Sequence, residues 1–144
     1  MTSVEERLQV LEDKQAIHDL LIAYGRALDR LDTKAYSELF AADGEWSGGI
    51  GQARTPAGIK KMLDDIFGQS TLRLASPRHV ISNMVIEVQG DTGRASSQWM
   101  WLVGDKEQNP TIMRAGSYHD ELVREKGEWK FQRRRAVTEL DRSA

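Results

Sequence analysis

The sequence predicts an α+β fold in which helices come first and a meander of long antiparallel strands follows. Apolar residues recur at helical spacing in the first half of the 144-residue chain and alternate at the strand spacing of two in the second half. The composition, 40% hydrophobic and 29% charged, is that of a soluble globular protein. We therefore expect a cone-shaped curved sheet whose central cavity is closed on one side by the N-terminal helices.

The first helix is predicted from residue 3 to about residue 31. Ser3 is a suitable N-cap, and Glu6 follows it at the capping-box spacing. Arg26 and Arg30 fall on the side of this helix that is expected to face water. The opposite, apolar stripe consists of Ile17, Leu20, Leu21, Tyr24, Leu28 and Leu31.

Two shorter helices and a strand are predicted between residues 34 and 67. The first helix of this region covers residues 34–40 and ends at residues 41–44, after which a strand begins at Glu45. Glycines at positions 48, 49 and 51 indicate a turn or a bulged strand. The other helix begins at Thr55-Pro56, since proline suits the first helical position, and it runs to about Phe67.

Four long strands are predicted in the second half, at residues 79–88, 94–103, 111–124 and 129–138. Turn sequences at 90–93 and 125–128 and a polar loop at 104–110 join them. One face of the second of these strands carries Ala95, Ser97, Trp99, Trp101 and Val103. The outer face of the sheet is expected to pack on another copy through Ile112, Tyr118 and Leu122.

The composition also argues against several classes of protein and site. A formal net charge of −2 argues against a nucleic-acid binder, and the lack of cysteine excludes disulfides and thiolate metal sites. No stretch reaches the roughly 20 apolar residues that span a bilayer, and the charged N-terminus does not resemble a signal peptide. We expect a single cytoplasmic domain, residues 1–144, with no membrane contact.

Tyr24, Asp29 and His79 are the candidate catalytic residues, because a phenol, a carboxylate and an imidazole can transfer protons without metal or cofactor. Each has a purely structural alternative. Tyr24 lies in the apolar stripe and fits a core tyrosine, while His79 could satisfy the end of a strand. Helical periodicity places Asp29 roughly 120° from the centre of the stripe, at the flank of the helix.

The remaining histidines do not indicate a metal site. His119 precedes Asp120 and Glu121, but adjacent strand residues point to opposite faces. His18 is expected to be solvated. The run of arginines at 133–135 is typical of an exposed or subunit-facing strand.

Six segments along the chain resemble the SnoaL-like branch of the nuclear transport factor 2-like superfamily. Their order and spacing carry the resemblance, which covers residues 5–140. The segments are residues 27–32, 39–46, 79–83, 90–95, 115–122 and 127–131.

The resemblance implies cofactor-free elimination, as in scytalone dehydratase, the bile-acid 7α-dehydratase and hexachlorocyclohexane dehydrochlorinase. Asp29 and His79 match the aspartate and histidine that these enzymes pair in the cone. Tyr24 matches the tyrosine of the bile-acid enzyme, and Arg134 falls where the dehydrochlorinase has an arginine, although a one-residue bulge would exchange it for Arg133 or Arg135. The side chains available to line an apolar cavity are Trp46, Phe67, Met84, Trp99, Trp101 and Met113.

Three functions remain open at this level. The leading hypothesis is a lyase, without metal or cofactor, that dehydrates a small, mostly apolar cyclic or aromatic substrate. The second is a ketosteroid-isomerase-like or polyketide-cyclase-like enzyme in which Asp29 is the base and Tyr24 the oxyanion donor. The third is a ligand-binding or scaffold protein without turnover. A homodimer or homotrimer is expected in each case.

Overall fold

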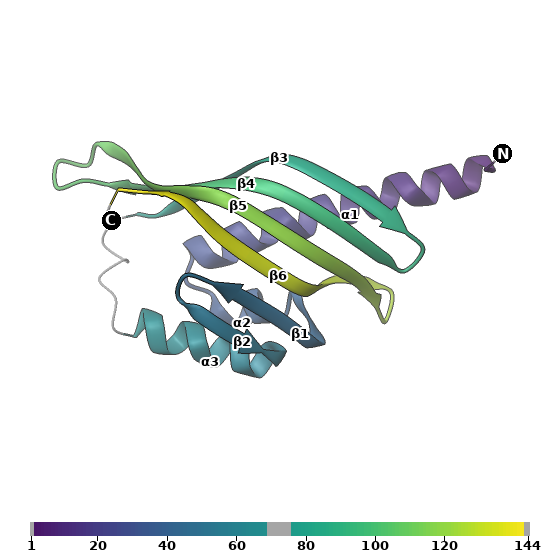
Figure 1. Ribbon diagram of the computed structural model, residues 1–144, viewed down its shortest axis with the longest axis horizontal. Coiled ribbons are helices and arrows are strands. Elements are labelled where there is room, and N and C mark those ends of the chain that lie inside the picture. The colour runs from purple at the N-terminus through teal and green to yellow at the C-terminus, as the bar shows by residue number, and fades with distance from the viewer. Residues whose placement is uncertain (1, 69–75, 143–144) are drawn as a thin grey trace.

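Three helices and a six-stranded curved sheet make up the computed structural model, which describes residues 2–68 and 76–142 (Figure 1). This confirms the predicted α+β class. None of the described helices is long and apolar enough to cross a membrane. The elements in chain order are α1 (Val4–Asp29), α2 (Thr33–Ser37), β1 (Phe40–Gly48), β2 (Gly51–Arg54), α3 (Thr55–Phe67), β3 (Arg78–Gln89), β4 (Thr92–Gly104), β5 (Pro110–Glu125) and β6 (Glu128–Asp141).

The strands are arranged in the order β2-β1-β6-β5-β4-β3. Strands β3 to β6 form the predicted antiparallel meander, and the tight turns at Gly90 and Gly127 adopt positive φ angles of 61° and 81°, which glycine tolerates at little cost. β1 pairs with β6 in parallel, in a register that places Glu45 beside Arg133. The predicted meander did not include this parallel pair, because it joins segments that are far apart in the sequence.

β1 begins at Phe40, five residues before the predicted start at Glu45, so the predicted helical end at residues 41–44 is wrong. Phe40 pairs with Phe131 of β6, whose N–H donates to the carbonyl oxygen of Leu39 at 2.9 Å. A Cβ on Gly44 would lie 2.9 Å from the carbonyl oxygen of Phe131. The glycine therefore permits close packing of β1 on β6 rather than a helix stop.

The inner face of the sheet forms the core against the helices. Ala95, Ser97, Trp99 and Val103 of β4 are buried there, and Trp101, which shares their parity, is half-buried. The expected outer positions of two residues are wrong: Tyr118 and Leu122 are buried, because they pair with Ser97 and Gly93 on the inner face. Ile112 is exposed as expected, beyond an irregularity between Trp101 and Leu102 that shifts the alternation.

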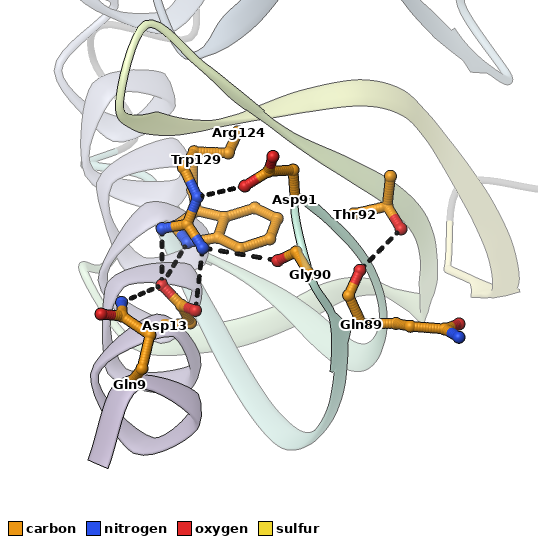
Figure 2. A network of polar contacts seen from close by, with 8 residues as sticks. All are labelled: Gln9, Asp13, Gln89, Gly90, Asp91, Thr92, Arg124 and Trp129. Carbon is orange, nitrogen blue, oxygen red and sulfur yellow. Dashed lines mark hydrogen bonds and ion pairs between the residues drawn. The ribbon is translucent and has the colours of Figure 1, made fainter. Parts of the chain in front are cut away.

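The first half of α1 is attached to the far end of the sheet through Asp13. Its carboxylate accepts hydrogen bonds from Nη1 and Nη2 of Arg124 at 2.7 and 2.9 Å and from the indole N–H of Trp129 at 3.1 Å (Figure 2). Arg124 also donates to Asp91 in the β3–β4 turn at 2.8 Å and stacks over the Trp129 ring. These bonds join α1 to β5, β6 and the β3–β4 turn.

A close approach of α1 to β3 lies further along the same helix, at Gly25. A Cβ at this position would be 2.9 Å from Cδ1 of Ile81 and 3.8 Å from Cβ of His79. The absence of a side chain lets the helix backbone approach the start of β3. α1 begins after the Ser3 N-cap, where the predicted capping box with Glu6 is present.

We predict that Asp13 stabilises the fold at neutral pH and that this contribution disappears in acid. The Arg124 hydrogen bonds lower the pKa of Asp13 to about 2, below the value of the unfolded chain. The stabilisation is therefore present above about pH 4, is lost as the pH falls towards 2, and amounts to about 2 kcal/mol for this nearly buried carboxylate. Urea unfolding of Asp13→Asn should show this loss at pH 7 and a weaker dependence on acid than the wild type.

Asp19 offers a matched control on the same helix, since its side chain is 69% exposed. Asp19→Asn should unfold like the wild type at pH 7. Equal destabilisation by the two substitutions would contradict the anchoring role of Asp13.

Candidate active site

Asp29 and His79 meet where α1 ends and β3 begins. The backbone N–H of His79 donates to both carboxylate oxygens of Asp29, at 2.9 and 3.0 Å. The ring Nδ1 lies 2.6 Å from Oδ1 of the same carboxylate. The two side chains are only 15% and 14% exposed, so solvent weakens this contact little. The structure thus brings together the two groups that the resemblance pairs.

This contact fixes which nitrogen of His79 carries the hydrogen. An ionised carboxylate can only accept hydrogen bonds, so Nδ1 must be the donor, and Nε2 of the neutral ring then has a lone pair available. Within residues 2–68 and 76–142, Nε2 has no hydrogen-bond partner. Trp101 stacks on the imidazole with ring centroids 6.2 Å apart, which restrains its orientation. His79 is therefore arranged to accept a proton.

Helical periodicity places Asp29 on the flank of α1. This position still allows contact with His79, because α1 packs chiefly along β3. Asp29 is the last residue of the helix, and Leu31 then turns the chain away with a φ of 56°. A carboxylate beside the carbonyl groups of a helix C-terminus is unfavourable. The two N–H groups that His79 directs at Asp29 offset this.

Tyr24 lies in the interior. Its hydroxyl oxygen accepts hydrogen bonds from the hydroxyl of Tyr36 at 2.7 Å and from the indole N–H of Trp46 at 3.0 Å. The described residues show no hydrogen bond from Tyr24 to Asp29 or His79. Tyr36 was not predicted as a site residue. The signal that could have indicated it is an aromatic side chain in a short helix next to the predicted cavity. Burial raises the pKa of Tyr36 well above its usual value, which keeps it a hydrogen-bond donor.

Arg134 is the arginine of the 133–135 run that points inward. It is fully buried, and its Nε and Nη2 donate to the two carboxylate oxygens of Asp120 at 2.7 and 2.9 Å. Arg133 and Arg135 are exposed, as expected for an arginine run on an exposed strand. The guanidinium carbon lies 4.1 Å from the ring centre of Tyr24 and 3.9 Å from that of Tyr118.

The charge of Arg134 is maintained by its partner. Burial acts to lower the pKa of Arg134, but attraction to the Asp120 carboxylate outweighs this effect, so the pKa is raised. Nη1 is buried and has no hydrogen-bond partner among the residues that the structure describes. A permanent cation thus lies against the ring of Tyr24.

The side chains predicted to line the cavity occupy different depths. Trp46 and Trp99 are buried, and Trp99 stacks on Tyr118 with ring centroids 5.8 Å apart. Phe67, Met84 and Trp101 are half-buried against the core. Met113 is half-buried at the irregular part of β5, where its carbonyl oxygen accepts from the N–H of Arg142 at 2.9 Å.

The other histidines lie outside this site. His18 is exposed on α1 with Nδ1 3.5 Å from Asp19, and His119 is exposed on the outer face of the sheet. No group of three or more potential metal ligands occurs in the described ranges.

Comparison with solved structures finds the same fold in several proteins of Novosphingobium aromaticivorans. A nuclear transport factor 2-like protein with a cystatin-like fold is 27% identical, with a TM-score of 0.84 over 100% of this chain and 94% of that one. A candidate scytalone dehydratase is 28% identical, with a TM-score of 0.75 over 90% and 86% of the two chains. The β subunit of a candidate aromatic-ring-hydroxylating dioxygenase is 20% identical, with a TM-score of 0.78 over 92% of each.

Sequence comparison gives a family but no individual relative. No curated protein matches the chain. The model of the SnoaL-like domain matches residues 9–135, a range that contains Tyr24, the Asp29–His79 pair and Arg134. The chain belongs to the SnoaL-like family, within the nuclear transport factor 2-like fold.

Proposed function

We propose that the protein is a cofactor-independent lyase that catalyses a dehydration-type elimination on a small, mostly apolar cyclic or aromatic substrate. The observation that carries the proposal is the bonding of His79, whose Nδ1 is held by Asp29 while Nε2 has no partner among the described residues. The likeness to a candidate scytalone dehydratase at 28% identity supports elimination chemistry.

In the proposed reaction, Nε2 of His79 removes a proton from a substrate carbon. The C–H electrons form the new double bond while the bond to the leaving hydroxyl breaks, and the proton taken up by the ring is returned to that hydroxyl to give water. The imidazolium that exists between these two transfers is stabilised by the Asp29 carboxylate. General acid–base catalysis of this kind contributes roughly 10²–10⁴-fold to the rate.

Tyr24 and Arg134 are proposed to supply the electrostatic part of catalysis. The Tyr24 oxygen already accepts two hydrogen bonds, which polarise its O–H and make it a stronger donor. We assign this remaining hydrogen to the leaving hydroxyl or to a substrate carbonyl oxygen. The Arg134 cation against the ring favours negative charge that develops at that position.

Binding of a ligand without turnover is the second candidate function. It is favoured by the interior contacts of Tyr24 and Arg134, which are also what a packed core requires. The isomerase alternative has less support, because both oxygens of Asp29 already accept hydrogen bonds from His79.

We predict that His79→Gln abolishes most of the elimination activity while the protein remains folded. Glutamine has no ring nitrogen that can take up a proton near neutral pH, so kcat should fall about 10²–10⁴-fold. The assay is loss of water, followed by mass spectrometry, from a panel of hydroxylated cyclic ketones, aromatic polyols and hydroxysteroids.

His18→Gln is the matched control, since His18 lies exposed on α1 and should leave the rate unchanged. Asp29→Asn should reduce kcat as well, but less than His79→Gln. If Asp29→Asn were the more damaging change and His79→Gln nearly silent, the isomerase mechanism would replace this one. If the wild type bound panel compounds without converting any, the binding function would replace it.

We predict that Tyr24→Phe lowers both the stability and kcat. The substitution leaves the Tyr36 hydroxyl and the Trp46 indole N–H without their buried acceptor, which costs about 1–3 kcal/mol in the free energy of unfolding. Tyr36→Phe serves as the comparison, because it removes one of these bonds but keeps the Tyr24 hydroxyl. A purely structural Tyr24 would give equal kcat values for the two variants, measured well below their melting temperatures.

A further inference from the structure

Trp101 differs from the other three tryptophans in the bonding of its indole N–H. Each of the others donates this hydrogen to an acceptor within the chain, over 3.0 to 3.2 Å: Trp46 to Tyr24, Trp99 to the carbonyl oxygen of Ser117, and Trp129 to Asp13. The indole N–H of Trp101 has no acceptor among residues 2–68 and 76–142. It is not one of the fully buried polar atoms of these ranges that lack a hydrogen bond, so a bound molecule can reach it.

Trp101 lies beside the candidate base. His79 of β3 and Trp101 of β4 are direct partners in the antiparallel register, so their side chains leave the sheet side by side on the inner face. The imidazole and the indole are inclined by 18°, and Trp101 is half-buried against the core. In the part of the chain that the structure describes, the residue with an unused donor is therefore the direct neighbour of the residue with an unused acceptor, Nε2 of His79.

On the side of β5, the Trp101 ring contacts a cation. Arg114 is the register partner of Trp101, and its guanidinium carbon lies 5.6 Å from the ring centre. Nε of Arg114 lies 3.1 Å from a carboxylate oxygen of Asp141 on β6, which holds the guanidinium in position. A cation over the ring attracts the electrons of the indole, so the N–H becomes a stronger donor. His79 and Arg114 thus restrain the ring from two sides and leave its N–H to a ligand.

The donor on Trp101 and the base on His79 together select the chemistry of the ligand. An indole N–H donates, cannot accept and carries no charge, so it matches a neutral acceptor oxygen. In the proposed reaction, Nε2 of His79 takes a proton from a substrate carbon. A carbonyl group on the adjacent carbon suits both residues, because its oxygen accepts the indole hydrogen and gains negative charge as the proton leaves, which strengthens that bond.

We propose that the indole N–H of Trp101 binds a carbonyl oxygen of the substrate and makes the site specific for cyclic or aromatic carbonyl compounds. The proton that His79 removes then lies on the carbon next to this carbonyl group, and the hydrogen of the Tyr24 hydroxyl is left for the departing hydroxyl. The inference rests on the proposed function, since it assigns an atom of the same substrate. Its test requires binding alone, so the two can fail separately.

The test compares 1-indanone with 1-methyleneindane, two molecules of the same shape that carry an oxygen and a CH₂ group at the same position. ¹H–¹⁵N spectra of the full chain resolve the indole N–H groups of the four tryptophans, and Trp101→Phe assigns the signal of Trp101. Saturating 1-indanone should move this signal downfield, whereas 1-methyleneindane, which has the same aromatic ring, should not. The signal of Trp129 is the internal control, because its N–H is bonded to Asp13 at the far end of the sheet.

Trp101→Phe should weaken the binding of 1-indanone about threefold to tenfold, the range expected for one hydrogen bond, and change the binding of 1-methyleneindane less than about twofold. Because phenylalanine is also smaller than tryptophan, a second variant replaces the Trp101 indole by a benzothiophene, with sulfur in the position of the N–H. This side chain fills the same space, and it should show the same selective loss of affinity for the ketone.

Two results would each overturn the proposal. One is a 1-indanone that does not bind, or that binds without moving the Trp101 signal. The other is a loss of affinity that is equal for the two probes in both variants. A ketone that is held by Trp101, in a wild type that dehydrates no hydroxylated compound, would support this inference and contradict the lyase function.

Discussion

The contact between the Asp29 carboxylate and the first residues of β3 determines where the candidate site lies. It joins the end of α1 to the strand that carries His79, and Gly25 allows the helix backbone to approach that strand. Asp13 attaches the other half of the helix to Arg124 and Trp129 at the far end of the sheet. α1 is thus held by one carboxylate on each side of the core, and the position of Tyr24 follows from these two attachments.

The interior beside this contact contains more polar groups than a minimal core would. Arg134 and Asp120 are both fully enclosed, and the cost of removing two charges from water is rarely recovered as stability. The rings of Tyr24, Tyr118 and Phe131 surround the guanidinium, so the cation is held in one place. A fixed positive charge against the ring of a tyrosine whose hydroxyl accepts two hydrogen bonds suits electrostatic catalysis, which benefits from dipoles oriented in advance.

Local patterns in the sequence predicted most elements, because the Ser3 capping box, Pro56 and the glycine turns act over a few residues. The early start of β1 and the inward direction of Tyr118 depend on distant partners in β6 and β4, which no local pattern contains. The same holds for the site. Periodicity placed Tyr24 in the core but left Asp29 at the helix flank, and only the packing of α1 along β3 explains how that flank meets His79. His79 was indicated by the small number of histidines in the chain and by the family resemblance, not by residue spacing.

The protonation of the two ring nitrogens of His79 tests the central claim most directly. Long-range ¹H–¹⁵N correlation spectra distinguish protonated from unprotonated ring nitrogens, and with three histidines in the chain His79→Gln assigns the signal. In its neutral form, His79 should be the tautomer with hydrogen on Nδ1 and a bare Nε2, and Asp29→Ala should shift the ring towards a mixture of tautomers. A wild-type ring with its hydrogen on Nε2, or a tautomer unaffected by Asp29→Ala, would contradict the assignment of His79 as a base oriented by Asp29.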